Sequence, residues 1–368
     1  MGNALVDGRP VPLDAAVTEA ARLLRASRSP LIAGLGTDVA GARAAIALAQ
    51  RIGAAVDHMH SRAVMADLEV MRESGMMVTT PNEARLRGDT LLLVGPGLTT
   101  AWPELSQRLL AQPLGAEAGE GARRVVWLCP GRGGAAAAVP GAQVVAGEAA
   151  DLPADLAGLR ARLGGRPCGR TRISDKALDA LAADLRAARF GVAVWSAAEL
   201  DVLTIDMLCG LVGDLNAQTR FTGLPLAPGD NAVGVTQVCG WMTGFPMRTG
   251  FARGYPEHDP WRFDAERMVA SGEADCALWI SAYRPAVPPW RSALPVIALA
   301  PSDAAFAQPP RVHIAVGQPG LDHAAVHYLP AFGLLGAVPA ARQSDAPAVA
   351  AAIAGIAGAL GDNGVWPC

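Results

Sequence analysis

Lysine is almost absent from this chain, and functions that require it are excluded. Of the 31 basic residues only Lys176 is a lysine. A phosphate-binding P-loop ends in Gly-Lys-Ser or Gly-Lys-Thr, and neither tripeptide occurs. A Schiff-base enzyme would have to use Lys176, but the pattern SDKALDALAADL places this residue in the exposed first turn of an amphipathic helix.

Clustered cysteines are also absent. Iron–sulfur and structural zinc sites usually take grouped thiolates from one loop. The six cysteines here are scattered, and none lies in the N-terminal third: Cys129, Cys168, Cys209, Cys239, Cys276 and Cys368. Cys129, Cys209 and Cys276 lie within apolar runs, which predicts buried, unreactive thiols. We therefore expect six reduced, structural cysteines, with no metal and no cofactor bound by this chain.

A long apolar run, a secretion signal and a basic net charge are missing as well. Mean hydropathy is +0.25, yet Gly, Pro or a charge interrupts every apolar run. None reaches the ~18 residues that a membrane-spanning helix needs. The first residues, MGNALVDGRPVPLD, lack the basic and apolar regions of a signal peptide. The net charge of −3 would not attract nucleic acid. The sequence predicts a cytoplasmic protein that binds neither membrane nor nucleic acid.

Short apolar runs alternate with amphipathic stretches along the chain. Continuous apolar runs predict strands buried on both faces of a parallel sheet. These strands are predicted at 30–36, 90–95, 124–129, 191–196, 276–281, 295–299 and 311–316. Helices are predicted at 14–25, 39–53, 102–110, 176–188 and 347–360, with Pro347 at the first helical position. Because 368 residues exceed one small core, we predict an α/β fold of two Rossmann-like domains with parallel sheets.

Two segments depart from this alternation. Residues 163–175 are rich in Gly, Pro and Arg and predict a linker. Residues 224–260 contain many Gly and Pro and show little regular pattern. A long irregular stretch in a compact protein is more often functional or interfacial than accidental, so we expect a functional surface there.

Glycine pairs and histidine pairs are the weaker candidate sites. Gly34-x-Gly36 and Gly95-x-Gly97 follow predicted strands, but neither completes the dinucleotide-binding fingerprint. His58-x-His60 would place two imidazoles on one face of a strand, and the pair His323 and His327 has helical i, i+4 spacing. No third ligand is apparent near His58 and His60, and Asp57 could equally hydrogen-bond a lone histidine. The segment LDHAAVHYLP (321–330) is short and ends in proline, so a strand or turn is an alternative to a helix there.

Arginines in irregular segments are the better candidates. Arg248, Arg253 and Arg284 occur near Tyr255 and Tyr283. The planar guanidinium suits bidentate contact with carboxylate or phosphate, so these residues predict an anion-binding surface. The alternative is that these arginines are merely solvated or bridge subunits.

Four stretches in order carry a resemblance to a known family. They are TTPNEARLRGDTLLLVG (79–95), GDLN (213–216), GDNAVGVTQVCGWMTGFPMRTGFARGYP (229–256) and ADCALWISAYRP (274–285). The chain resembles the B subunit of formylmethanofuran dehydrogenase, in the molybdopterin oxidoreductase superfamily. It is most similar to the B subunits of bacterial formyltransferase/hydrolase complexes. The resemblance covers most of the chain, and the GFP…GYP block is its most specific part.

The redox centre of that family has no counterpart here. Redox-active members bind an iron–sulfur cluster through an N-terminal cysteine group, and a Cys or selenocysteine followed by His ligates tungsten or molybdenum. The ligand position falls at Arg62-Ala63-Val64, and Ala227-Pro228 replaces an active-site arginine. Without thiolates the metal would have no affinity for the site. The resemblance therefore implies a subunit without the iron–sulfur domain and without redox activity.

The resemblance also implies a role and partners. In the bacterial complex a formyl group passes from formyl-tetrahydromethanopterin to a methanofuran-type carrier and is hydrolysed to formate. That chemistry is attributed to other subunits: the amidohydrolase-like A, C, and the formyltransferase D. This chain would be a scaffold without catalytic residues. Arg248, Arg253, Tyr255 and Arg284 would contact the carrier's polyglutamate tail.

The domain layout implied by the resemblance is discontinuous. One α/β domain would combine residues 1–58 and 264–368, with residues 59–263 inserted as the other. Two alternative functions stay open on the sequence alone. One is a formylmethanofuran dehydrogenase subunit that keeps a molybdopterin or tungstopterin, and the other is a stand-alone nucleotide-binding α/β protein.

Overall fold

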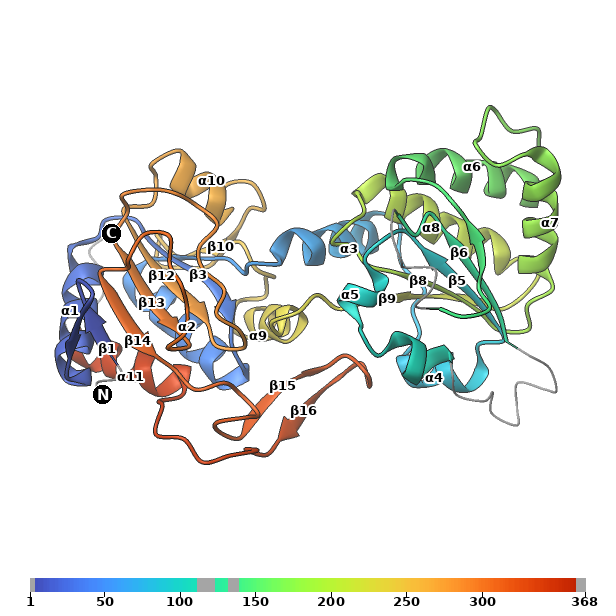
Figure 1. Ribbon diagram of the computed structural model, residues 1–368. Helices are drawn as coiled ribbons and strands as arrows, with labels where there is room; N and C mark the ends of the chain where they lie inside the picture. The colour runs from blue at the N-terminus through green and yellow to red at the C-terminus, as the bar shows by residue number, and fades with distance from the viewer. Residues whose placement is uncertain (1–3, 111–122, 132–138, 362–368) are drawn as a thin grey trace. The chain divides into compact units, whose positions relative to one another are not determined.

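The chain folds into two units, each built around its own sheet (Figure 1). The computed structural model describes residues 4–110, 123–131 and 139–361. The first unit contains the described residues of Met1–Ser61, Gly229–Tyr328 and Leu335–Cys368. The second contains those of Arg62–Pro228 and Leu329–Leu334. The predicted α/β class is confirmed.

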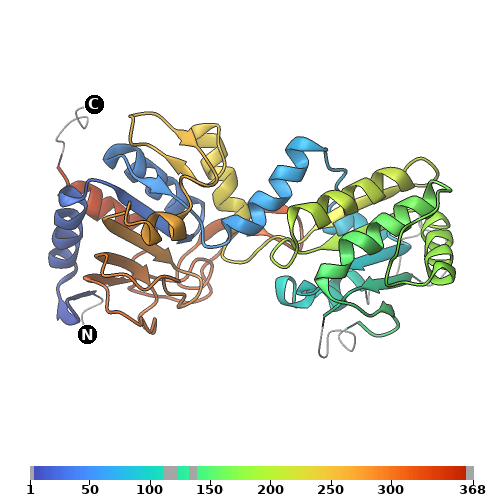
Figure 2. The same cartoon turned by 90° about the horizontal axis from the view of Figure 1, so that it is seen from above.

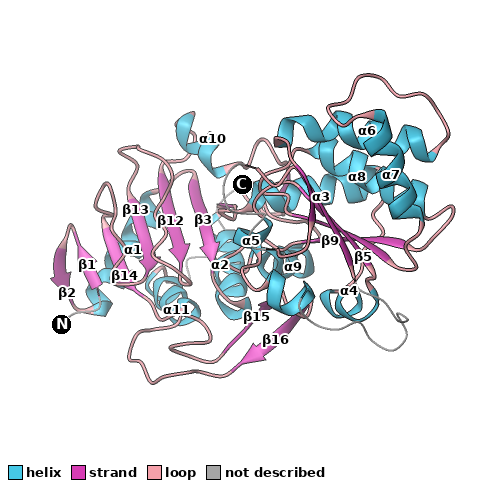
Figure 3. Ribbon diagram, turned by 45° about the vertical axis from the view of Figure 1, so that its right-hand side comes forward, coloured by secondary structure: helices cyan, strands magenta, loops and turns pink. Residues whose placement is uncertain are grey.

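The sheet of the first unit is parallel in its centre and antiparallel at its edges. Its strand order is β11-β10-β4-β3-β12-β13-β14-β1-β2, and Figure 3 shows the part from β3 to β2. Strands β4, β3, β12, β13 and β14 pair in parallel, and the outer strands pair antiparallel. Every residue of β3 and β12 is buried, which explains their uninterrupted apolar sequences. The strands are β1 (Ala4–Val6), β2 (Arg9–Val11), β3 (Pro30–Gly36), β4 (Ala55–Val56), β10 (Thr249–Gly250), β11 (Glu257–His258), β12 (Cys276–Ser281), β13 (Val296–Ala300) and β14 (Val312–Ala315).

Helices cover both faces of this sheet. Helix α11 contacts both α1 and α2, and the three form one layer (Figures 1 and 2). Helix α10 covers the other face, where Met268 packs with Leu31 and Trp279. Helix α2 begins after Asp38, whose carboxylate accepts from the Gly41 N–H. The helices are α1 (Leu13–Ala26), α2 (Val39–Ile52), α9 (Ala232–Thr243), α10 (Ala265–Ala270) and α11 (Val349–Ala359).

The second unit has three layers around a sheet in the order β7-β6-β5-β8-β9, with every described pair parallel. Leu92 of β5 packs with α6, α7 and α8, whereas Leu91 and Leu93 pack with α4 and α5. The strands are β5 (Thr90–Val94), β6 (Arg124–Leu128), β7 (Gln143–Val145), β8 (Gly191–Trp195) and β9 (Phe221–Pro225). The described helices are α3 (Ser61–Glu73), α4 (Pro81–Arg87), α5 (Leu98–Ala101), α6 (Leu152–Leu163), α7 (Asp175–Arg186) and α8 (Val202–Leu215), and α6 is preceded by a 3-10 turn (Ala149–Asp151). No helix in the described part of the chain is long and apolar enough to cross a membrane.

Three predicted elements differ from the structure. The helix predicted at 102–110 is replaced by α5 and a π-helical turn (Ser106–Leu110), because Pro103 disfavours helical backbone at Trp102. Pro347 precedes the N-cap Ala348 instead of opening α11. The segment 224–260 contains α9, β10 and β11, so the prediction of an irregular stretch was wrong over these residues.

The units also divide the chain at other points than the predicted domain boundaries. The predicted inserted domain was 59–263, whereas residues 229–263 belong to the first unit. They pack there because β10 pairs with β4, and the Arg248 N–H donates to the Val56 carbonyl. A hairpin of β15 (Ala325–Leu329) and β16 (Leu334–Val338) follows, and its turn, residues 329–334, belongs to the second unit.

Candidate functional site

The carboxyl ends of β3 and β12 lie side by side in the first sheet. The chain continues from β3 through α2 to β4 on one side, and from β12 to β13 on the other. In open α/β sheets, ligands bind in the crevice outside such a reversal of strand order. The segments that follow β3, β4 and β12 are therefore the first place to look for functional side chains.

The backbone brings the ends of these two strands close together. Gly34 and Leu35 have φ angles of 80° and 53°, and the pairing with β12 shifts register between Trp279 and Ser281. A Cβ on Gly34 would lie 2.5 Å from the Ile280 carbonyl oxygen. Only glycine fits both the angle and the close approach. This irregularity gathers the residues that follow the two strands.

Asp230 is the centre of a polar cluster at this edge, formed by His58, His60, Asp230 and Arg284 and called the Asp230 cluster below. The Asp230 side chain is only 3% exposed. Its carboxylate accepts from His60 Nε2 at 2.9 Å and from Arg284 Nε at 2.7 Å, while its carbonyl lies 3.0 Å from His58 Nε2. Burial opposes ionisation, but the bonds from His60 and Arg284 hold the pKa of Asp230 below its usual value. Both bonds reach the Oδ2 atom, and the carboxylate is therefore charged.

His58 is held neutral in one tautomer. Burial lowers the pKa of His58 to about 4. Its Nδ1 accepts from the His60 backbone N–H at 3.0 Å, so its Nε2 carries the proton and donates to the Asp230 carbonyl. Both ring nitrogens are engaged, so His58 has a structural role.

Asn231 ties the same edge to the hairpin. Asp230 and Asn231 both have left-handed backbone, with φ angles of 55° and 61°. The Asn231 amide donates to the Thr37 carbonyl at 2.8 Å, and its oxygen accepts from the Tyr328 N–H at 2.8 Å. Strained backbone of this kind persists where the surroundings fix it and is frequent at binding sites.

Arg248 is committed to two carboxylates. Its side chain is 16% exposed and lies 2.5 Å from Asp264 and 3.6 Å from Asp57, and it also donates to the Pro260 carbonyl. Burial raises the pKa of Asp57 to about 6, although the nearby Arg248 charge acts in the opposite direction. Asp57 also accepts from the Ala265 N–H at 2.9 Å. Arg248 thus fastens the segment of β10 and β11 to the sheet.

The other predicted anion-binding residues are more accessible but also paired. Arg253 is 61% exposed, bonds Glu257 at 3.1 Å, and has its pKa raised by a hydrogen bond with Tyr255. Arg284 is 54% exposed and belongs to the Asp230 cluster. The structure therefore brings Arg253 and Tyr255 together, and gives Arg248, Arg253 and Arg284 different carboxylate partners.

The central residue, Asp230, was missed from the sequence. Its partner His60 is 170 positions away, so pattern alone could not pair them. The available signal was Gly229-Asp230-Asn231, a composition typical of left-handed turns.

The two histidine pairs have different surroundings. His58 and His60 follow β4 in a turn, with ring centroids 5.7 Å apart. His327 lies in β15, where its Nδ1 meets the Tyr283 hydroxyl at 3.1 Å, and His323 lies in the loop before that strand. Among the described residues, no three His, Cys, Asp or Glu side chains are grouped to hold a metal ion.

The position that the resemblance assigns to a tungsten or molybdenum ligand does not fit such a centre. Arg62, Ala63 and Val64 form the first turn of α3, and Ala63 and Val64 are only 5% and 8% exposed. An arginine and two buried aliphatic side chains offer neither a thiolate nor an imidazole to a metal.

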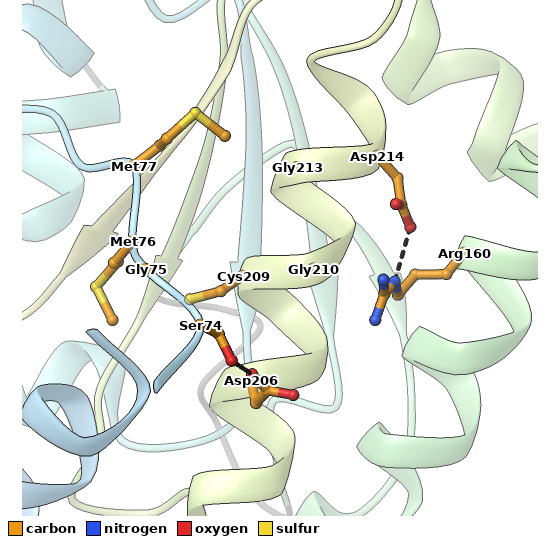
Figure 4. A pocket seen from close by; sticks show the side chains of 10 residues that line it. All are labelled: Ser74, Gly75, Met76, Met77, Arg160, Asp206, Cys209, Gly210, Gly213 and Asp214. Atoms are coloured by element: carbon orange, nitrogen blue, oxygen red, sulfur yellow. Dashed lines mark hydrogen bonds and ion pairs between the residues drawn. The ribbon is translucent and has the colours of Figure 1, made fainter. Parts of the chain in front are cut away.

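The cysteines are free thiols in the described part of the chain, and Cys368 lies outside it. Cys129, Cys239 and Cys276 are buried. Cys209 is only partly buried, contrary to expectation, because it lines a cavity of about 500 Å³ beside α8 (Figure 4). Burial, with Asp67 and Asp206 nearby, raises the pKa of Cys209 to about 12, which leaves it a poor nucleophile.

The charged side chains around this cavity bond to neighbouring side chains. Figure 4 shows Arg160 of α6 bonded to Asp214 of α8, with a separation of 2.7 Å. The Ser74 hydroxyl donates to Asp206 at 2.6 Å. The cavity wall thus contains one ion pair and one carboxylate that bonds a neutral hydroxyl.

Comparisons with known proteins agree with these features. No family model matches the sequence. The B subunit of the formyltransferase/hydrolase complex of Methylorubrum extorquens is 37% identical over 321 residues, which cover 86% of this chain and 85% of the relative. The B subunit of the tungsten-containing formylmethanofuran dehydrogenase 2 of Methanocaldococcus jannaschii is 27% identical over 286 residues, covering 75% and 65%.

A solved structure matches nearly the whole chain. It is the crystal structure of the M. extorquens formyltransferase/hydrolase complex with methylofuran, in which one chain is 35% identical, with a TM-score of 0.87 and coverage of 97% of this chain and 98% of that one. The chain is therefore a two-unit α/β protein similar to the B subunits of formylmethanofuran dehydrogenases. Within that class, it belongs to the family formed by the B subunits of formyltransferase/hydrolase complexes. The family resemblance predicted from the motifs is confirmed.

Proposed function

We propose that this chain is a non-redox subunit of a formyltransferase/hydrolase complex and that it organises the other subunits, A, C and D. The observation that carries the proposal is the match over 97% of the chain to a solved complex of this kind. The complex would pass formyl groups to a carrier such as methylofuran and release formate, with both reactions in the partners. Arg62, Ala63 and Val64 at the ligand position support a role without a metal.

Exposed aromatic side chains in the first unit support a role in assembly. Trp, Tyr and Arg are enriched at protein interfaces and supply much of their binding energy. Arg267 stacks 4.4 Å above the Trp261 ring, which fixes that ring although it is 72% exposed. The aromatic surface group, as we call it, consists of Trp241, Phe245, Tyr255 and Trp261, which are 63%, 39%, 53% and 72% exposed.

The carrier's glutamate-rich tail is the proposed ligand of the arginines. Arg253 and Arg284 expose more than half of their side chains and keep donors for a second carboxylate. Tyr255 lies beside Arg253 and adds a hydroxyl. Arg248 would act mainly by holding the segment that presents Arg253, because Asp57 and Asp264 already engage it.

Elemental analysis of the native complex tests the non-redox role. We expect tungsten, molybdenum and iron–sulfur iron to be far below stoichiometry with this chain. Stoichiometric tungsten or molybdenum would overturn the proposal and favour a dehydrogenase subunit, whose pterin would appear as a fluorescent oxidation product after acid extraction.

Replacement of the aromatic surface group tests the role in assembly. Trp241→Ser and Trp261→Ser together should release this chain from the complex in pull-down and size-exclusion experiments. The matched control is Leu203→Ser, which removes a 58% exposed apolar side chain in the second unit. Retention of the double variant would show that these rings face solvent in the complex.

A further inference from the structure

A second pocket, in the second unit, is not used by the proposed function. It has a volume of about 290 Å³ and is lined by α4, by the segment after α5 and by the turn 329–334. Two arginines and two aromatic rings dominate its wall: Arg85, Arg108, Trp102 and Phe332. Pro81 and Ala331 complete the apolar part.

Within the described residues, one of the two arginines on the pocket wall has no carboxylate partner. Arg108 bonds Glu104 at 3.0 Å. Arg85, in contrast, makes no ion pair or side-chain hydrogen bond to any residue in the described ranges 4–110, 123–131 and 139–361. A free guanidinium on a pocket wall provides donors for an incoming anion.

Arg123 strengthens the positive field at this place. Its guanidinium donates to the carbonyls of Gly88, Leu109 and Arg85, and no carboxylate within the described residues pairs with it. Burial, together with the charge of Arg85, lowers the pKa of Arg123. Arg85 and Arg123 therefore repel each other, although the Arg123 guanidinium bonds the Arg85 carbonyl. An anion in the pocket would stabilise both cations.

The rings define the other half of the ligand. Trp102 is 6% exposed and packs in a core cluster with Leu105 and Leu109, so its position is fixed. Phe332 is 46% exposed and lines the pocket from the turn 329–334. Fixed apolar walls with a few polar groups are typical of small-molecule sites, and a volume of roughly 300 Å³ is at their lower end.

We propose that this pocket binds a small molecule in which a carboxylate or phosphate is attached to a flat apolar group. The anion pairs with Arg85, and the flat group lies between Trp102 and Phe332. All of its lining residues belong to the second unit, whereas the arginines proposed for the carrier belong to the first.

Three naphthalene probes test the site on the full chain by isothermal titration calorimetry. 2-Naphthoate and 2-naphthyl phosphate carry the anion, and 2-naphthamide keeps the rings without charge. We expect at least one acid to bind at least tenfold more tightly than the amide, and the preferred acid distinguishes carboxylate from phosphate. Equal binding of all three, or no binding of either acid, would overturn the proposal.

Variants assign the binding to named residues. Arg85→Gln removes a charged hydrogen bond and should weaken the acid roughly 10- to 100-fold, while Arg85→Lys keeps part of the affinity. The control Arg72→Gln, in the same unit, removes an arginine that is 71% exposed and paired with Glu73. Phe332→Ser should weaken acid and amide alike. Unchanged affinity in a folded Arg85→Gln chain, checked by circular dichroism, would refute the assignment.

The assembled complex provides the last arm. Binding to both the free chain and the complex supports a small-molecule site. Binding to the free chain alone would mean that an acidic partner segment occupies the pocket, which overturns the small-molecule proposal. The titrations of the free chain depend neither on metal content nor on assembly, so a negative result in them leaves the proposed function intact.

Discussion

The neutral, buried His58 makes a sharp prediction about acid stability. Its pKa of about 4 in the folded chain compares with an ordinary value of about 6.5. Between pH 6.5 and pH 4, His58 is protonated in the unfolded chain and neutral in the native chain. The contribution of His58 to the free energy of unfolding is therefore fully present above about pH 6.5, and it is lost as the pH falls toward 4.

The size of the effect follows from the two pKa values. Between pH 7.5 and pH 5 the unfolded imidazole becomes almost fully protonated and the native one only slightly. Linkage then gives a loss of about 2 kcal/mol, and the limit below both pKa values is about 3 kcal/mol. His58→Gln abolishes this titration while it keeps an N–H donor for the Asp230 carbonyl.

Comparison of the variant with the wild type isolates His58 from every other titrating group. Hydrogen exchange of β3 and β12 peptides measures the opening free energy of the first unit in both chains. The free energy of His58→Gln minus that of wild type should rise by about 2 kcal/mol from pH 7.5 to pH 5. A difference that stays constant with pH would refute the assignment of His58 as a buried neutral group.

Three further predictions concern the same unit. Asp57→Asn should show the opposite trend. The folded pKa of Asp57 is about 6, so this carboxyl stabilises the native state at low pH, and the stabilisation is lost as the pH rises from 4 to 6. In the same exchange experiment, the opening free energy of the variant minus that of wild type should therefore fall by about 1 kcal/mol from pH 7.5 to pH 5. Gly34→Ala should lower the free energy of unfolding by about 3 kcal/mol, since strain and a backbone clash add, whereas Gly75→Ala, with φ of 79° and open space, should cost about 1 kcal/mol in urea unfolding. Arg248→Ala leaves two carboxylates without their partner and should cost about 3 kcal/mol by urea unfolding, while Arg253→Ala should leave stability unchanged.

Seven strands of the two sheets could be predicted, because a strand that is buried on both faces has a continuous apolar sequence. The predicted 30–36 and 276–281 coincide with β3 and β12. The segment 229–263 was harder, because α9 has two internal glycines and β10 and β11 have two residues each. Their placement depends on tertiary contacts such as Arg248 with Asp264, which no local pattern contains.

The candidate site was only half predictable for a related reason. Arginines in an irregular, glycine-rich segment indicate anion contact. Whether such a charge is available to a ligand, however, depends on the carboxylates that pair with it in the fold. Arg284 pairs with Asp230, which is 54 positions away in the sequence, and Arg248 pairs with Asp57, which is almost two hundred positions away. The sequence therefore predicted three available cations, whereas in the structure all three arginines are ion-paired and differ in exposure.

The Asp230 cluster gives a physical reason why polar groups can be buried at this edge of the sheet. An unpaired buried polar group costs about 1–3 kcal/mol. Here His60 and Arg284 bond the Oδ2 atom of Asp230, His58 bonds its carbonyl, and Asn231 bridges two further backbone groups. These contacts join segments that lie far apart in the sequence, so the arrangement of this edge depends on tertiary hydrogen bonds that no local pattern contains.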